Sequence, residues 1–485
     1  MKNALLRDDN RLAAWSRVLI LAVPLLFVTV AMDNDFWFTI NHGRYILEHG
    51  FAHVEPFTVH EGLDFSFEKW LTCITFYKIY DWFGPWGAYV FIQLVFVLII
   101  WLFYRVCLLF SEGNETVSLA VTVLAMSLLG NSYIRTRPQI FSYLFLIAEL
   151  YCLERYARSD DLRRLYPLPL LALLYMQFHS TMLPVFFIIM LPYLCDFGWV
   201  DLLGIQGSRY RKWPILAAMA ACALASLINP YGLRSVIYLF RSLDDGGLLR
   251  NINEVKPTGW KDLLAYCGGV LACHLLYVVL WIRRREKFPL RFLFLSAGTF
   301  VMALYAVRNN AFYIIMGSAV AAWELRRIPT EFRLMPLVKK LAALAAVVSI
   351  AVCCTFSYDL MWKTHAHEAM DAFYEIHPDT NVSLYTTFNC GSYAEWLGYR
   401  CYADPRAEVF LKSINGKADI LEEVWATTHN GITLDEMQEK YHFDYWLVMK
   451  DRSMDKQIQR NGRYTLLVEE GDYRIYRSPD ATDGG

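Results

Sequence analysis

Charged residues are scarce in this chain, and neither sign is in excess. Only 19% of the 485 residues are charged, 56% are hydrophobic and 16% are aromatic. A soluble protein usually carries about 25% charged residues, so this composition excludes an ordinary soluble domain and indicates a membrane protein with several spans. The formal net charge of −1 leaves no basic surplus for a phosphate backbone, which excludes nucleic acid as a partner.

A cleavable secretory signal is also missing. The first apolar run, from Trp15 to Met32, is long enough to span a bilayer, and Asp33 stands where a signal peptide would have small residues. We expect this run to stay in place as an anchor. No internal repeat or low-complexity segment is evident.

Apolar runs of about 20 residues, the length that crosses a bilayer, predict about eleven transmembrane helices. The runs are 14–32, 86–110, 117–134, 138–154, 165–178, 180–197, 213–229, 263–282, 289–307, 310–326 and 336–356. We therefore predict a polytopic α-helical membrane domain over residues 1–356.

The basic residues set the orientation of these spans. Lys and Arg gather at alternate ends, in clusters near Arg7, near Arg164, near Arg211 and at Arg283 to Arg285. Such clusters mark cytoplasmic ends. We therefore predict a cytoplasmic amino terminus, with the segments 33–85, 230–262 and everything after about 357 outside the cytoplasm. The predicted location is the cell membrane, that is, the inner or plasma membrane.

Residues Trp70 to Phe83 look apolar but number only 14. A helix of that length reaches roughly 21 Å, short of the roughly 30 Å hydrocarbon core. We predict an amphipathic helix lying in the outer interface, within the first outer loop 33–85.

The carboxyl-terminal segment 357–485 has charges at ordinary density and short strand-like runs, at 381–385, 445–449, 464–468 and 473–476. Helical patterns lie between them, at His365 to Glu375 and Leu434 to Lys440. We predict a small extracytoplasmic α/β domain here. Cys390 and Cys401 lie in this domain with ten residues between them, and because it is placed outside the cytoplasm we predict a disulfide between them.

Zinc is not predicted. The four histidines His42, His49, His53 and His60 of the first outer loop match no usual zinc spacing. The other cysteines lie mostly in apolar runs, where cysteine is usually a small buried hydrophobe.

In this topology the outer ends of the spans hold many polar residues: Asp33, Asp35, His42, Glu68, Arg135, Arg137, His179, Asn229, Glu254, Arg308 and Asn309. Charged groups at membrane depth are costly and usually line a polar cavity, so we expect a cleft open to the outside. The planar guanidinium suits phosphate, which makes Arg135, Arg137 and Arg308 the candidate phosphate ligands; snorkelling to lipid headgroups is the alternative.

The paired carboxylates Asp33 and Asp35 follow the first span directly, where a helix end usually has basic or aromatic residues. A carboxylate there could act as general base on an acceptor hydroxyl or hold a divalent cation, magnesium or manganese, against a phosphate. Both roles stay open, and no cofactor is assigned. Asp404 and Arg406 either contact substrate or form a turn pair inside the tail domain.

These residues resemble a known superfamily. A first span ending in Asp33-Asn34-Asp35, followed by Phe67-Glu68-Lys69-Trp70 and closed by Phe83-Gly84, is similar to the GT-C glycosyltransferases, in particular the lipid A aminoarabinose transferases and protein mannosyltransferases. The runs Arg135-Thr136-Arg137-Pro138, Asn229-Pro230-Tyr231-Gly232 and Asp404-Pro405-Arg406 resemble bacterial membrane proteins placed near that superfamily. Trp70-Leu71 stands where the aminoarabinose transferases have two prolines, and the tryptophan-tryptophan-aspartate motif of oligosaccharyltransferases is missing.

The resemblance implies transfer of a sugar from a polyprenyl-phosphate donor to a lipid, glycan or protein acceptor on the outer membrane face, with inversion. It gives Asp33 or Asp35 the catalytic place and Glu68 the place of the acid in the phenylalanine-glutamate-lysine motif, with membrane lipids as further partners. Two alternatives remain: a transporter or flippase of a lipid-linked or anionic solute, and a scaffold subunit without turnover. Transport predicts polar groups near the bilayer midplane, where His274 is the clearest example.

Overall fold

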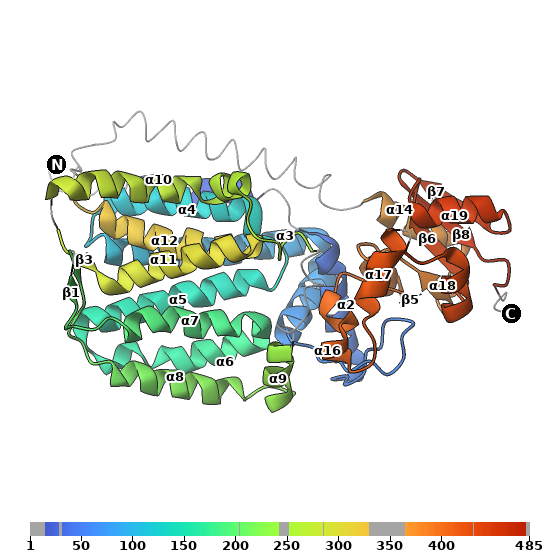
Figure 1. Ribbon diagram of the computed structural model, residues 1–485, viewed down its shortest axis with the longest axis horizontal. Helices are drawn as coiled ribbons and strands as arrows, with labels where there is room; N and C mark the ends of the chain where they lie inside the picture. Colours follow the sequence, from blue (N-terminus) through green and yellow to red (C-terminus); the bar gives the residue numbers. More distant parts are fainter. Residues whose placement is uncertain are drawn as a thin grey trace, which may run out of the picture. The chain divides into compact units, whose positions relative to one another are not determined.

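The computed structural model describes residues 15–28, 32–202, 204–241, 252–284, 286–328, 364–429 and 431–481. They belong to two compact units, each built from segments far apart in the chain (Figure 1). Of the described residues, those within 1–31, 89–229 and 250–358 form the helical unit, and those within 32–88, 230–249 and 359–485 form the mixed unit. The sequence assigned residues 33–85 to the membrane domain, whereas in the structure they share a compact unit with the tail.

The helical unit is a bundle of apolar helices. Its helices are Trp15–Phe27, the second part of α3 (Trp70–Phe110), α4 (Glu115–Tyr133), α5 (Gln139–Ser159), α6 (Pro167–His179), α7 (Leu183–Leu194), α8 (Trp213–Ser226), α10 (Trp260–Arg284), α11 (Leu290–Tyr305) and α12 (Asn310–Glu324). A small sheet, β1 (Asp201–Leu202), β2 (Ile205–Gln206) and β3 (Phe288–Pro289), joins two of its loops.

The fold class predicted from the sequence is confirmed, but the span count is not. Among the described residues, four ranges are long and apolar enough to cross a membrane: Trp70–Phe110, Glu115–Tyr133, Leu162–Leu194 and Trp260–Val279. A one-turn 3-10 helix, Ser180–Met182, separates α6 from α7 within the third range. The sequence predicted two spans there, 165–178 and 180–197. Each of the first ten predicted ranges contains a helix; the eleventh, 336–356, lies outside the described residues.

Helix α12 is the centre of the helical unit. All fifteen of its residues are buried, and it packs against α4, α10 and α11. A helix that is apolar all round is stable only inside such a bundle. Elsewhere in the unit, the buried ion pairs of Arg291 on α11 with Glu154 on α5 (2.9 Å) and with Asp196 after α7 (3.3 Å) tie three segments together.

Helix α3 is broken at Gly84. The backbone there has φ 61° and ψ −158°, a conformation that favours glycine, and Pro85 follows, which cannot continue the hydrogen-bond ladder. The break separates Trp70 to Phe83 from the long apolar stretch, as the sequence indicated. That the first part lies in the membrane interface stays a prediction.

The tail portion of the mixed unit has a five-stranded sheet in the order β5-β4-β6-β8-β7. The strands are β4 (Ser383–Tyr385), β5 (Arg400–Cys401), β6 (Tyr445–Met449), β7 (Thr465–Glu470) and β8 (Tyr473–Arg477), with β4 parallel to β5 and β6 and the others antiparallel. The four predicted strands are confirmed; β5, with two residues, was not predicted.

Helices surround this sheet. They are α14 (His365–Ile376), α15 (Gly391–Leu397), α16 (Lys412–Asn415), α17 (Ile420–Thr428), α18 (Leu434–Tyr441) and α19 (Ser453–Asn461). The two predicted helices, α14 and α18, are confirmed. Helix α18 begins at a capping box in which Thr433 and Glu436 satisfy each other's backbone N–H groups, and the fully buried Trp446 of β6 stacks on Tyr385 of β4 in the core.

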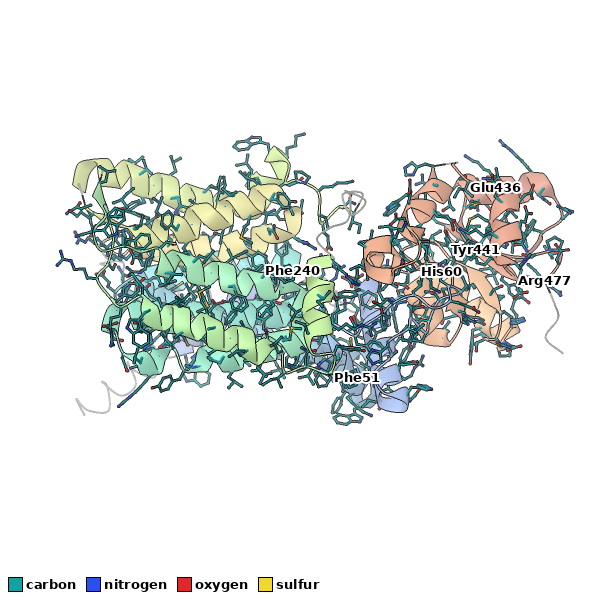
Figure 2. The ribbon with its side chains drawn as sticks, turned by 60° about the horizontal axis from the view of Figure 1, so that its bottom comes forward. Phe51, His60, Phe240, Glu436, Tyr441 and Arg477 are labelled. Carbon is teal, nitrogen blue, oxygen red and sulfur yellow. The ribbon has the colours of Figure 1, made fainter. Side chains whose placement is uncertain are left out.

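The first loop is part of the same unit. Its helix α2 (Asn34–His49) packs on α15, and α9 (Leu233–Arg241) packs on α16. Residues 57–59 extend the sheet beside β5, because Val59 N–H donates to the Cys401 carbonyl at 2.9 Å and Thr58 forms a parallel bridge with Cys401. His60 Nε2 lies 2.8 Å from the Tyr402 carbonyl, and its ring packs edge-on against Tyr441 (Figure 2).

Candidate functional site

Asp33 and Asp35 begin helix α2. Asp33 is the N-cap, and its Oδ1 accepts a hydrogen bond from Asp35 N–H at 3.1 Å. A carboxylate in the first turn also interacts favourably with the helix dipole. Both side chains are partly exposed. Asp33 therefore has a capping role in folding, whatever else it does.

Glu68 lies just before α3 and directly after Phe67, whose backbone is hydrogen-bonded to Tyr231. Tyr231 Oη accepts from the preceding Phe67 N–H at 3.2 Å and donates to the Ala52 carbonyl at 2.8 Å. The Glu68 Oε1 atom is buried and has no hydrogen-bond partner among the described residues. Burial raises the pKa of Glu68 well above its usual value, and the negative charge of Glu408 raises it further.

A second acid and a phenol accompany Glu68. Burial raises the pKa of Tyr238 on α9, and the charges of Glu68 and Glu408 add to that shift. Glu68, Glu408 and Tyr238 are thus close enough to influence one another's ionisation. A carboxyl with a raised pKa among such neighbours is a candidate for proton transfer.

The mixed unit also contains a buried charge cluster around Arg406. The guanidinium is 1% exposed and contacts three carboxylates, of Glu55 (3.0 Å), Glu395 (3.4 Å) and Asp404 (2.5 Å). Glu55 in turn accepts hydrogen bonds from the backbone N–H groups of Phe57 and Thr58 and from the Thr58 hydroxyl. Buried charges persist only when they are paired and hydrogen-bonded in this way.

His42 belongs to this cluster. Its Nε2 lies 3.1 Å from Arg406 Nη1, and its ring stacks on Phe57 at 5.0 Å. Burial, and then the charge of Arg406, lower the pKa of His42 well below its usual value. A neutral imidazole that accepts from Arg406 Nη1–H fits these contacts.

Asp404 and Arg406 take the turn-pair arrangement that the sequence left open. Asp404 Oδ1 accepts from the Arg406 backbone N–H at 2.7 Å and from Arg406 Nε at 2.8 Å. Both residues are almost fully buried. Their contacts hold the first loop against the tail, and contact of either residue with substrate stays a prediction.

The predicted disulfide is not formed. Cys390 and Cys401 are both buried free thiols. Cys390 Sγ accepts from the Thr387 hydroxyl at 3.1 Å, and Cys401 Sγ lies 3.5 Å from the Gly391 carbonyl. Cys390 is the N-cap residue of α15, whereas Cys401 is the last residue of β5. Two cysteines on either side of a turn in the sequence therefore need not form a disulfide.

The helical unit gathers four of the predicted residues at Glu254. Arg137 Nη1 donates to Glu254 Oε1 at 2.8 Å, and Arg308 N–H donates to the Glu254 carbonyl at 3.0 Å. Arg137 N–H bonds to the Arg135 carbonyl at 2.7 Å. The segments before α5, before α10 and after α11 therefore meet at Glu254. That this is the outer end of the bundle, and that it holds substrate, stay predictions.

The remaining predicted residues of this unit lie at neighbouring helix ends. His179, the last residue of α6, has its Nδ1 2.6 Å from the hydroxyl of Ser142 on α5. Asn229 Nδ2 donates to the Ser226 carbonyl at 3.0 Å at the end of α8, and Asn309 Nδ2 donates to the Met302 carbonyl of α11 at 3.0 Å. The Asp33, Asp35 and Glu68 carboxyls belong to the other unit, so their grouping with these residues stays a prediction.

Asp33 and Asp35 alone do not form a complete cation site. In the described ranges no three His, Cys, Asp or Glu side chains come together in a way that could hold a metal ion. Two carboxylates supply only part of the roughly six oxygen ligands that magnesium takes.

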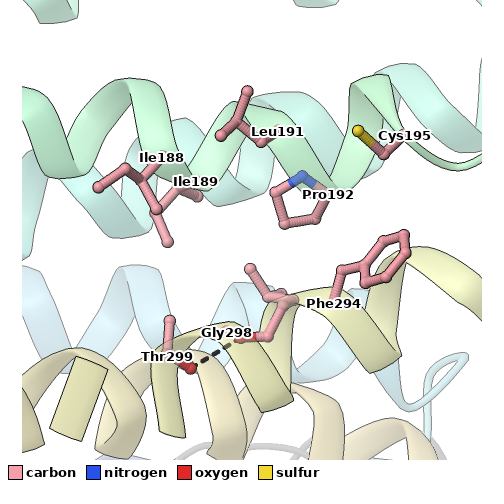
Figure 3. A pocket seen from close by; sticks show the side chains of 9 residues that line it. Ile188, Ile189, Leu191, Pro192, Cys195, Phe294, Gly298 and Thr299 are labelled. Atoms are coloured by element: carbon pink, nitrogen blue, oxygen red, sulfur yellow. Dashed lines mark hydrogen bonds between the residues drawn. The ribbon is translucent and has the colours of Figure 1, made fainter. Parts of the chain in front are cut away.

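A cavity of about 250 Å³ between α7 and α11 is lined by Ile188, Ile189, Leu191, Pro192, Cys195, Phe294, Leu295, Gly298 and Thr299 (Figure 3). Its lining is almost entirely apolar, and the hydroxyl of Thr299 is bonded to the Leu295 carbonyl. It offers no group for phosphate or proton chemistry and is not the candidate active site.

Comparison with solved structures identifies the architecture. An Archaeoglobus fulgidus oligosaccharyltransferase tethered to an acceptor peptide superposes over 90% of this chain and 69% of its own, with a TM-score of 0.57 and 12% identity. ArnT from Cupriavidus metallidurans matches over 98% of both chains, with a TM-score of 0.53 and 11% identity. The chain shares the fold of these two solved structures, which is the GT-C fold that the sequence predicted.

This GT-C fold is shared without recognisable sequence similarity. No family model matches the chain, and no curated protein matches it in sequence. Another structure of the Archaeoglobus fulgidus enzyme, with a TM-score of 0.50, holds an inhibitory peptide and a dolichol-phosphate, and a further one, with a TM-score of 0.52, is a complex with zinc and sulfate. The long apolar helices of the described residues indicate a membrane location.

Sequence reasoning missed several residues of the mixed unit. Glu55, Glu395 and Glu408 were not singled out, although each is a carboxyl close to a predicted residue in space. Glu395 is separated from Arg406 by 11 residues and Glu55 by 351. The sequence offered one signal, a glycine at the start of the segment Gly391–Leu397 that contains Glu395. In the structure Gly391 lies against the Ala403 backbone, since a Cβ there would be 1.9 Å from the Ala403 carbonyl oxygen.

Proposed function

We propose that this protein is a membrane glycosyltransferase that moves a sugar from a polyprenyl-phosphate donor to a lipid, glycan or protein acceptor outside the cytoplasm. The GT-C-like fold supports membrane glycosyl transfer as the general activity. The observation that carries the proposal to a mechanism is the Glu68 carboxyl, with a buried oxygen that has no partner among the described residues and a raised pKa.

Glu68 acts as general base in this proposal. The acceptor hydroxyl oxygen attacks the anomeric carbon, the bond from that carbon to the phosphate oxygen breaks, and the phosphate leaves with the electron pair. The acceptor proton passes to the Glu68 carboxylate. A carboxyl whose pKa is raised toward the working pH is a stronger base than an ordinary glutamate once ionised, and single displacement inverts the anomeric configuration.

The arginines of the helical unit bind the donor phosphate in this scheme. Arg137 is partly exposed and pairs with the Glu254 carboxylate, which orients its planar fork. The Arg308 backbone N–H donates to the Glu254 carbonyl, so Arg308 lies next to this pair in the chain fold. Phosphate that carries a developing charge as it leaves is stabilised by such preplaced donors. Asp33 and Asp35 hold the start of α2, and either could supply a second carboxylate to the substrate.

The test is a transfer assay with purified full-length protein in lipid nanodiscs, using a radiolabelled polyprenyl-phosphate sugar and a panel of acceptors. Glu68→Gln is expected to lower kcat by about 10²- to 10⁴-fold, the usual contribution of a general base. The matched control is Asp81→Asn, a partly exposed acid of the same unit that pairs with Lys78. Full activity of Glu68→Gln would contradict the proposal.

A transporter or flippase is the second candidate, because the bundle contains polar groups away from its ends. Glu149 in the middle of α5 is fully buried, and neither carboxyl oxygen has a partner among the described residues. His274 of α10 lies 2.7 Å from Glu324 and 3.2 Å from Ser296. Intramembrane ionisable groups often belong to ion or solute pathways. The test is uptake of an anionic solute by proteoliposomes that contain the protein. If Glu149→Gln abolished this uptake but left glycosyl transfer intact, transport would be supported.

A further inference from the structure

A cavity of about 360 Å³ opens within the mixed unit, and Glu68 is not among the residues that line it. It is lined by α2, by Pro56 and Phe57 of the first loop, and by the segment from Glu395 to Arg400. All of these belong to one compact unit. Pockets that bind small ligands begin at about 300 Å³, so there is room for a ligand of one or two small rings.

Two buried side chains of this lining each have one polar atom without a hydrogen-bond partner among the described residues. Asn41 is 2% exposed and Glu395 is 3% exposed, and Asn41 Nδ2 and Glu395 Oε2 have no hydrogen-bond partner there. Asn41 Oδ1 already accepts from Arg44 Nη2 at 2.7 Å, which fixes the orientation of the amide. A buried polar atom without a partner costs about 1–3 kcal/mol, and a ligand that supplies partners for both atoms would recover this.

Of the three carboxylates around Arg406, that of Glu395 lies farthest from the guanidinium. Asp404 and Glu55 hold the guanidinium at 2.5 Å and 3.0 Å, while Glu395 Oε1 is 3.4 Å away. Burial raises the pKa of Glu395 well above its usual value, and the neighbouring Asp404 charge raises it further. The carboxyl also shares a hydrogen bond with Asp404. Asn41 Nδ2 can donate to a ligand hydroxyl and Glu395 Oε2 can accept from one.

The basic residues of the wall are already engaged. Arg44 donates to the Trp396 carbonyl at 2.9 Å and stacks over the Trp396 ring at 4.4 Å. Arg400 donates to the Thr58 carbonyl through Nε and Nη2. With Glu48 at the exposed rim, the wall carries both signs of charge, and this favours a neutral ligand over a phosphate.

An aromatic surface completes the cavity. Tyr45 stacks on His49 with ring centroids 4.6 Å apart and meets Phe57 edge-on at 5.2 Å. Flat rings beside a small number of converging polar groups are typical of sites for small organic ligands. A sugar ring has hydroxyl groups at its edge and an apolar face of C–H groups, which suits both features.

We propose that this cavity binds a neutral saccharide of one or two rings, with its hydroxyl groups on Asn41 Nδ2 and Glu395 Oε2 and its apolar face on Tyr45. The choice of a saccharide over other neutral polyols rests on the proposed function. The binding itself does not depend on catalysis at Glu68, so it can be tested separately from transfer.

The experiment measures binding of glucose, galactose, mannose, N-acetylglucosamine and maltose to the full chain in nanodiscs by saturation-transfer difference NMR, with inorganic phosphate as a comparison. At least one sugar is expected to bind. Asn41→Asp keeps the acceptor for Arg44 but removes the donor, and Tyr45→Ala removes the aromatic wall; each is expected to weaken binding at least tenfold, about the effect of one lost interaction of this kind. Tyr464→Ala, which leaves the cavity intact, is the control and should bind as the wild type does.

Protection of His49 gives a second readout that needs no variant. The exposed His49 ring lines the cavity, so a bound sugar should slow its carbethoxylation, while the exposed His429 should react at an unchanged rate. Binding of phosphate but of no sugar, unchanged affinity in both cavity variants, or no protection of His49 would each overturn the proposal. Sugar binding without transfer would contradict only the proposed function, and transfer without sugar binding would contradict only this cavity.

Discussion

Arg406 Nη1 lies 3.1 Å from Nε2 of His42, a residue 364 positions earlier in the chain. This contact, with those of Glu55 and Asp404, joins the first loop to the tail inside one compact unit. The first loop, in which the sequence singled out Asp33, Asp35 and Glu68, therefore packs against the tail within this unit.

The Arg406 cluster predicts a large loss of stability on removal of its cation. Arg406→Met leaves the buried carboxylates without their partner, and breaking a buried ion pair on one side costs about 3–5 kcal/mol. Thermal unfolding of the full chain, followed by tryptophan fluorescence, should show the Tm of the mixed unit lowered by about 10 °C. Arg460→Met, an exposed arginine of α19, is the control. A Tm within about 2 °C of wild type would show that the cluster contributes little.

The raised pKa of Glu395 predicts a pH-dependent difference from Glu395→Gln. A group whose folded pKa is raised contributes its stability fully below its unfolded pKa, about 4.3 for glutamate, and loses it as pH rises through the folded value. Glutamine mimics the protonated carboxyl at every pH. The Tm of Glu395→Gln minus that of wild type should therefore increase from pH 4.5 upward. A difference that stays flat or decreases would contradict the protonated assignment.

Cys390 and Cys401 should behave as two protected thiols. Burial raises the pKa of both, and the thiolate is the reactive form, so an alkylating reagent should label them slowly in the folded protein. After unfolding without reductant, both should be fully alkylated, as peptide mass spectrometry can measure. Recovery of the two peptides joined through sulfur would restore the disulfide that the sequence predicted.

Arg137 should be sensitive even to a conservative change. Lysine keeps the charge but lacks the planar fork that Glu254 orients, and one charge-assisted hydrogen bond contributes about 1.5–3 kcal/mol. Arg137→Lys is therefore expected to lower kcat/KM for the lipid-phosphate donor about 10- to 100-fold. The matched control is Arg163→Lys, an exposed arginine in the loop after α5. Equal kinetics for the two variants would remove Arg137 from the phosphate site.

Local patterns in the sequence predicted the elements well. Strand-like runs gave β4, β6, β7 and β8, and helical periodicity gave α14 and α18, because alternation and amphipathicity are properties of neighbouring residues. Apolar length located the helices of the bundle. The break at Gly84 could be expected from a glycine followed by proline.

Contacts between distant segments could not be predicted in this way. The pairing of Thr58 with Cys401 adds only a few backbone hydrogen bonds, which leave no periodic pattern. Glu55 and Glu395 look like ordinary surface acids in the sequence, since nothing local reveals that they are buried against Arg406. The same limit explains the cysteine prediction, which depended on spacing rather than on where each sulfur points.

The most direct measurement is the single-turnover rate of sugar transfer by wild type and Glu68→Gln, from pH 5 to pH 9, in the same nanodiscs. Wild-type transfer is expected to rise with pH as a carboxyl with a pKa above the usual glutamate value ionises. The variant should be slower by about 10²-fold or more and lack that rise. Equal rates and the same pH profile in both proteins would contradict glycosyl transfer with Glu68 as its base.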